Sequence, residues 1–241
     1  MSGIDDEIEA VKKQYPDESN SAFNLILSVA GQFNLLAGVV NTIKQQFSGA
    51  AATQKVMALL NAFEQTIRRL ERNVERLSSR LESPEFVETL TVAVNETIRT
   101  SDRNKIERFA VVLGYSVADL TKALSLQEAS AYIRDLAQLS EADIEAMRIL
   151  YSIQSPLFID GAVPTNPNPY TEVIDKVLAA VDRTRVSREE FYSRCSRLNG
   201  FGLAIEVMRN NNRMSPGDHC FRLTKRGARL VEILTPPTEA V

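Results

Sequence analysis

Few residues of this chain belong to the types that carry nucleophilic or metal chemistry. The 241 residues include two cysteines, Cys195 and Cys220, and one histidine, His219. Three such side chains are too few for a Cys/His zinc site, and two cysteines do not make the disulfide framework of a small secreted protein. His219 and Cys220 are adjacent on an expected strand, so their side chains point to opposite faces and cannot bind one metal ion together.

Short catalytic motifs are absent as well. The sequence contains no phosphate-binding P-loop, no dinucleotide fingerprint, no nucleophile elbow and no HExxH pair. Carboxylates dispersed along the chain could still form a site without leaving a short motif. From these residue types we predict a protein that is not an enzyme, with no catalytic residues, no metal and no cofactor.

The elements that hold the two cysteines form a series. Ser187 and Glu190 have the spacing of a capping box at the start of a helix that runs to Leu198. The segments that follow are FGLAIEVMRN, the polar turn NNRMSPGD, HCFRLTKRG and a last helix ARLVEIL. Together with two helices expected before it, SEADIEAMRILYSIQ and TEVIDKVLAAVDRT, this series resembles a winged helix. LTKRG resembles the usual end of that module. The resemblance implies that the helix from Ser187 to Leu198 is a recognition helix, the element that enters the major groove of DNA.

Helical spacing divides that helix into two faces. Phe191, Cys195 and Leu198 are spaced by four and three residues, so we expect them to face the core, with Cys195 as a buried apolar residue rather than a nucleophile. Gly200 or Gly202 would supply the bend into the following strand. The candidate residues for contact with nucleic acid or a partner protein are Tyr192, Ser193, Ser196, Arg197, Arg209 and Arg213.

Local charge leaves the partner of this module open. Between Arg183 and Arg229 there are eleven arginine and lysine side chains and four carboxylates, a net charge of +7 in a chain whose net charge is −3. This excess favours contact with phosphates. Glu189 and Glu190, in the first turn of the helix, would repel phosphates, and winged helices also dock on proteins. DNA binding, protein binding and a purely structural role are all compatible with the sequence.

The front of the chain has the strongest apolar patterns. Residues 19–43 carry no charged side chain, and Gly31 and Gly38 in this stretch would let another helix approach closely. A heptad pattern with charges outside its seam follows between Leu60 and Leu81. The two stretches predict a long helical hairpin that holds copies of the chain together, so we expect a homo-oligomer. The candidate oligomerisation residues are Gly31, Gly38, Leu60, Phe63, Ile67, Leu70, Val74, Leu77 and Leu81.

Two other interpretations of this front half stay open. The seam is three heptads long, and an ordinary amphipathic helix packed on a core shows the same pattern. An uncharged stretch of 25 residues is also long enough to span a bilayer, so residues 19–47 could insert into a membrane. Asn24, Asn34 and Asn41 disfavour insertion, and we expect this stretch to be buried in a bundle or against a second protomer.

The middle of the chain predicts a small helical bundle. Ser83-Pro84-Glu85 signals a helix start, and Ser125 and Ser140 are each followed three residues later by an acidic residue. The succession of the helical front, TSDRNKIERFAVVLG, LSEADIEAMRILYSI and FRLTKRGARLVEIL resembles a group of bacterial helical proteins that includes the abortive-infection Abi-alpha type, over residues 80–235. The resemblance implies a role in phage defence or a related regulatory system, and it brings no catalytic residues.

Together these patterns predict a mainly α fold: a long helical hairpin or coiled coil, a small helical bundle, and a C-terminal winged helix with a β-hairpin. Cysteine usage and the acidic N-terminus favour the cytoplasm. The expected function is that of a self-associating regulator or sensor that binds DNA or a protein partner. The alternatives are a membrane-acting effector and a structural component of a large assembly. The expected divisions are an N-terminal arm (1–18), the hairpin (19–83), the bundle (84–139), the winged-helix-like domain (140–235) and a tail (236–241).

Overall fold

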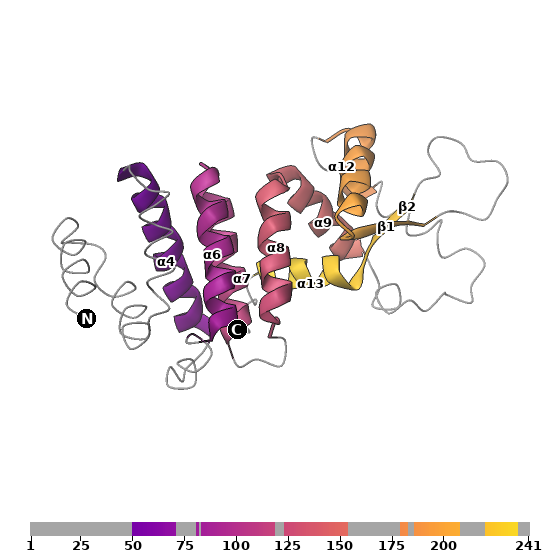
Figure 1. Cartoon of the computed structure of the whole chain (residues 1–241). Coiled ribbons are helices and arrows are strands. Elements are labelled where there is room, and N and C mark those ends of the chain that lie inside the picture. Colours follow the sequence, from indigo (N-terminus) through magenta and orange to yellow (C-terminus); the bar gives the residue numbers. More distant parts are fainter. Residues whose placement is uncertain are drawn as a thin grey trace, which may run out of the picture. The chain divides into compact units, whose positions relative to one another are not determined.

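The computed structural model is mainly helical, with a small antiparallel sheet of two strands in the part of the chain that it describes (Figure 1). This confirms the mainly α prediction at the level of secondary structure. The chain divides into two compact units, Met1–Gln138 and Leu139–Val241. The structure describes residues 50–70, 81, 83–118, 123–153, 179–182, 186–207 and 220–235.

The described part of the first unit is a helical bundle. Helix α4 packs against α7 and α6, and α8 packs against α6 and α7. Its core is built from large apolar side chains, and the rings of Phe63 and Phe86 stack with their centroids 5.8 Å apart. The helices are α4 (Ala50–Leu70), α6 (Pro84–Arg99), α7 (Arg103–Val117) and α8 (Leu126–Gln138).

Helices α4 and α7 approach each other closely at Gly114. A Cβ atom at this position would lie 2.4 Å from Cγ2 of Thr66, which is closer than two carbon atoms can approach. Thr66 donates its hydroxyl to the carbonyl of Ala62 at 2.8 Å, so its methyl group is the part that meets α7. The missing side chain of Gly114 therefore allows the helices to pack at this distance.

Several helix starts have the caps that their sequences predict. The hydroxyl of Ser83 accepts from the Phe86 amide at 3.1 Å, and Pro84 occupies the first helical turn. Ser125 and Glu128 form a reciprocal capping box, because the Ser125 amide donates to Oε2 of Glu128 at 2.9 Å and the Glu128 amide donates to the Ser125 hydroxyl at 3.2 Å. These caps satisfy amides that have no partner inside the helix.

Part of the candidate oligomerisation seam lies within the described residues of the first unit. Leu60, Phe63 and Ile67 are buried inside the first unit, where α4 packs on helices of its own chain. Leu81 is also buried, and Leu70 is partly exposed. The described part of α4 thus belongs to the same unit as α6, α7 and α8, although the sequence assigned it to a separate hairpin. Gly31, Gly38, Val74 and Leu77 lie outside the described residues, so the predicted role of this seam in self-association stays a prediction.

None of the helices in the described ranges combines the length and the apolar composition needed to cross a membrane. The stretch 19–47, which the sequence offers as a candidate membrane segment, lies outside those ranges.

In the described part of the second unit, helices pack on the sheet and on one another. Helix α12 packs on β1 and on α9, whereas α13 packs on α9 and on β2. The strands are antiparallel, and their register pairs Ala204 with Leu223 and Val207 with Cys220. Phe221 and Leu223 are buried on the inner face of β2. The elements are α9 (Glu141–Ile153), α12 (Arg188–Gly200), β1 (Ala204–Val207), β2 (Cys220–Leu223) and α13 (Lys225–Leu234).

The bend between α12 and β1 is made by Gly202 rather than Gly200. Gly202 has a φ angle of 66°, in the left-handed region that glycine adopts without strain, and Gly200 is the last residue of the helix. Thr224 secures this bend from the other end of the hairpin, because its hydroxyl donates to the carbonyl of Gly202 at 2.7 Å. The same hydroxyl accepts from the Gly227 amide at 3.1 Å and so caps α13.

Candidate interface on helix α12

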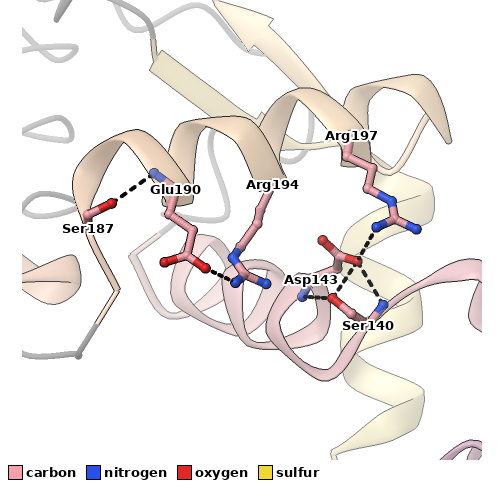
Figure 2. A network of polar contacts seen from close by, with 6 residues as sticks. All are labelled: Ser140, Asp143, Ser187, Glu190, Arg194 and Arg197. Carbon is pink, nitrogen blue, oxygen red and sulfur yellow. Dashed lines mark hydrogen bonds and ion pairs between the residues drawn. The ribbon is translucent and has the colours of Figure 1, made fainter.

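The inward face of α12 is built as the sequence predicts. Phe191, Cys195 and Leu198 are buried, so the buried role predicted for Cys195 is confirmed. The helix begins after Ser187, whose hydroxyl accepts from the Glu190 amide at 3.2 Å. The carboxylate of Glu190 pairs with Arg194 instead of returning to Ser187, so the expected capping box is only half formed in the contacts that Figure 2 draws.

The outward face of α12 differs from the prediction at Tyr192. Ser193, Ser196 and Arg197 are exposed, as expected, but Tyr192 is only partly exposed. Its ring centroid lies 6.4 Å from that of Phe221 on β2, and this contact draws the side chain toward the sheet. Arg209 and Arg213, the two other candidate contact residues, lie outside the described residues.

Arg197 is paired with a buried carboxylate of a neighbouring helix. Nη1 of Arg197 lies 3.5 Å from Oδ2 of Asp143, near the start of α9 (Figure 2). The Arg197 side chain is 50% exposed, whereas that of Asp143 is 2% exposed. Arg197 therefore exposes about half of its side chain to solvent, as predicted, while its guanidinium contacts Asp143 on α9.

Asp143 is held in place by its own helix start. Its Oδ2 atom accepts from the amide and from the hydroxyl of Ser140, both at 2.7 Å. In return, the Asp143 amide donates to the Ser140 hydroxyl at 3.2 Å. The predicted capping box at Ser140 is confirmed, and it directs a carboxylate toward α12 that the sequence did not connect with that helix.

The other two arginines of α12 are also paired. Arg188 forms a fork on Asp182, with Nε to Oδ1 at 3.0 Å and Nη2 to Oδ2 at 2.6 Å. These hydrogen bonds lower the pKa of Asp182 below its ordinary value and raise that of Arg188. Arg194 pairs with Glu190, one helical turn earlier. Each arginine of α12 therefore faces a carboxylate.

This pairing changes the charge balance inferred from the sequence. Asp143 and Asp182 both lie outside the stretch 183–229 from which the net charge of +7 was counted. When α12 is taken with the partners of its three arginines, those arginines face Asp143, Asp182 and Glu190, and Glu189 adds a further negative charge. The sequence does not predict the pairing of Arg197 with Asp143, because the two residues lie 54 positions apart. The capping motif indicates only that Asp143 lies at a helix start.

More basic residues follow on β2 and α13. Lys225 is exposed, and Nη1 of Arg226 donates to the carbonyl of Phe201 at 2.7 Å, next to the end of α12. On the outer face of the hairpin, Ile205 is 42% exposed and pairs across the strands with Arg222. The exposed parts of α12 and the hairpin are thus mixed in charge and contain one exposed large apolar side chain within the described residues.

Further polar contacts hold the second unit together. The Tyr151 hydroxyl on α9 lies 3.1 Å from Oε1 of Glu232 on α13. Partial burial raises the pKa of Tyr151, and the hydrogen bond and negative charge of Glu232 raise it further.

Within the described ranges, no group of three or more His, Cys, Asp or Glu side chains is arranged to bind a metal ion.

Comparison with known proteins gave no match: no family model, no curated protein and no solved structure matches this chain.

Proposed function

We propose that the chain is a non-enzymatic regulatory or sensor protein that self-associates, and that its C-terminal unit resembles a winged helix and binds DNA through the exposed face of α12. One observation carries this proposal. Helix α12 fixes one face in the core through Phe191, Cys195 and Leu198, and presents Ser193, Ser196 and half of Arg197 to solvent directly before an antiparallel hairpin. A rigid helix with a polar outer face is the element that reads a groove in this class of module.

The basic residues of the unit support contact with phosphates. Lys225 is exposed, and Arg188 and Arg197 each expose about half of the side chain. An ion pair at the surface is weak, with a median contribution of roughly 0–1 kcal/mol, so a phosphate can compete for Arg188, whose partner Asp182 is about half exposed. Arg209 and Arg213, which lie between β1 and β2 in the sequence, would add two positive charges.

Salt dependence tests the DNA half of the proposal. Fluorescence anisotropy of a labelled mixed-sequence duplex, titrated with full-length protein at several salt concentrations, measures both the affinity and its slope. For about three phosphate contacts, log K should fall with log salt with a slope near −3, since each contact contributes about 0.9. Undetectable binding at low salt, or binding that does not respond to salt, would remove DNA as the partner.

The paired arginines favour a second candidate, docking on a protein. A helix whose three arginines all face carboxylates is close to neutral, and neutral polar surfaces with a nearby apolar residue such as Ile205 suit the rim of a protein interface better than a phosphate backbone. The same titration separates the two candidates, because a protein-docking module gives no salt-dependent affinity for duplex DNA.

Self-association is the part of the proposal that rests on the front of the chain. The uncharged stretch 19–43 supports it, as does the small-residue pair Gly31 and Gly38. Light scattering of the full-length protein should give a mass that is a multiple of the single-chain mass, and G31L with G38L should reduce it. A single-chain mass at micromolar concentration would refute this part.

The resemblance to Abi-alpha-type proteins supports phage defence as the biological setting of the protein.

A further inference from the structure

We propose that Asp143 is an autoinhibitory partner of Arg197: it neutralises the guanidinium on α12 and thereby limits the affinity of the second unit for DNA phosphates. This inference rests on the proposed function, because it concerns the regulation of the same surface. Its physical basis is the ion pair at 3.5 Å between Nη1 of Arg197 and Oδ2 of Asp143 (Figure 2).

The first step concerns the rigidity of the carboxylate. Asp143 lies near the start of α9, and the amide and hydroxyl of Ser140 both donate to its Oδ2 atom at 2.7 Å. The negative charge is also favoured there by the positive end of the helix dipole. These two hydrogen bonds hold the Asp143 carboxylate in place, so it cannot swing into solvent to release Arg197.

The second step compares the three arginine pairs of α12. The partners of Arg188 and Arg194 are about half exposed, at 52% for Asp182 and 50% for Glu190, whereas Asp143 is 2% exposed. Water and salt screen exposed pairs efficiently and buried charges much less. Of the three arginines, Arg197 thus has the partner that solvent screens least.

The third step is the consequence for binding. A phosphate that approaches the exposed half of Arg197 meets a cation whose charge is already balanced by a fixed carboxylate. Removing the charge of Asp143, while keeping its shape and its hydrogen bond at the helix start, leaves the full positive charge of Arg197 for the phosphate. Affinity for DNA should then rise by roughly three- to tenfold at low salt, and the salt slope should steepen by about 0.9, as for one added phosphate contact.

The test compares Asp143→Asn with a matched control, Glu145→Gln, in the full-length protein. Both substitutions remove one negative charge from α9, but Glu145 pairs with Arg148 and not with α12. Asp143→Gln serves as a second variant, because glutamine at this position of a capping box keeps the helix start. Urea unfolding of each variant confirms that it is folded before duplex DNA is titrated.

The expected result is that the Asp143 variants bind duplex DNA more tightly than Glu145→Gln does, and that adding Arg197→Gln abolishes the gain. Equal affinities for the Asp143 variants and the control, or a gain that persists without Arg197, would overturn the inference. Failure of the proposed function is distinct: in that case neither the wild type nor Arg197→Gln binds DNA with a salt-dependent affinity. If wild type binds and Arg197→Gln weakens it while the Asp143 variants show no gain, only the autoinhibition is wrong.

Discussion

Thr224 and Gly227 explain the sequence of the motif LTKRG, which joins β2 to α13. Thr224 ties the bend at Gly202 to the start of α13 with one hydroxyl, which donates to one backbone and accepts from the other. Gly227 lets α13 lie against the start of β1, because a Cβ atom there would be 1.9 Å from the carbonyl oxygen of Leu203. The motif is therefore a joint between helix and sheet, and both of its defining residues act through the backbone.

Gly227→Ala should destabilise the second unit by about 3 kcal/mol or more, since the added methyl group meets a backbone oxygen that cannot move without displacing β1. Urea unfolding measures the change. Gly200→Ala is the matched control, because nothing beyond the neighbouring residues and the backbone of its own helix lies within 4 Å of the added Cβ. Its stability should be unchanged or raised by up to about 1 kcal/mol. Equal stability of the two variants would contradict this description of the joint.

The Asp182–Arg188 pair should be visible as a shifted titration. Hydrogen bonds from Arg188 lower the pKa of Asp182 below 3.8, so the carboxyl is ionised more readily in the folded protein than in the unfolded chain. The contribution of the pair to stability is present above the unfolded pKa and is lost as the pH falls through the folded pKa. Carboxyl NMR shifts should therefore show a midpoint below 3.8, and Arg188→Gln should raise it. An unchanged midpoint in that variant would mean that the pair does not persist in solution.

At the scale of helices and strands, the local sequence predicts where several helices start, but it does not predict which elements pack together. The starts of α6, α8, α9 and α12 follow from capping residues within four positions of one another, and the inward face of α12 follows from helical spacing. The same rules could not tell whether Leu60, Phe63 and Ile67 pack on their own chain or on a copy, because the apolar seam is identical in both cases. Likewise, the capping motif marked Asp143 but could not reveal that Arg197 lies beside it.

The placement of α4 gives a prediction at this scale. Phe63 is buried and stacks on Phe86 within the first unit, so Phe63→Ala should lower the free energy of unfolding by about 3–5 kcal/mol. Gln65→Ala, at an exposed position of the same helix, should change it by less than about 0.5 kcal/mol. Circular dichroism during urea unfolding, at protein concentrations differing at least tenfold, makes the comparison. A loss of stability that depends on concentration would indicate that Phe63 packs against another copy instead.

For the whole molecule, the chain divides into two compact units, Met1–Gln138 and Leu139–Val241. We propose self-association for the first unit and binding for the second. The charge balance of the second unit shows why binding could not be settled from the sequence. A count over a contiguous stretch gave an excess of positive charge, whereas folding brings Asp143 to Arg197 from outside that stretch and leaves Asp182 beside Arg188. The net charge of a sequence segment is a poor measure of the charge of the surface that it forms.

The most direct test of the account is the affinity of full-length Arg197→Ala with Arg213→Ala for duplex DNA. A control that removes two exposed arginines elsewhere, Arg103→Ala with Arg148→Ala, has the same net charge. The account predicts that the first variant binds at least about threefold more weakly than the control. Its salt slope should be shallower by about 0.9 for the lost contact of Arg213, with a smaller contribution from Arg197, whose charge Asp143 already balances. Equal affinity and equal slope in the two variants would contradict the proposal that Arg197 and Arg213 contact DNA.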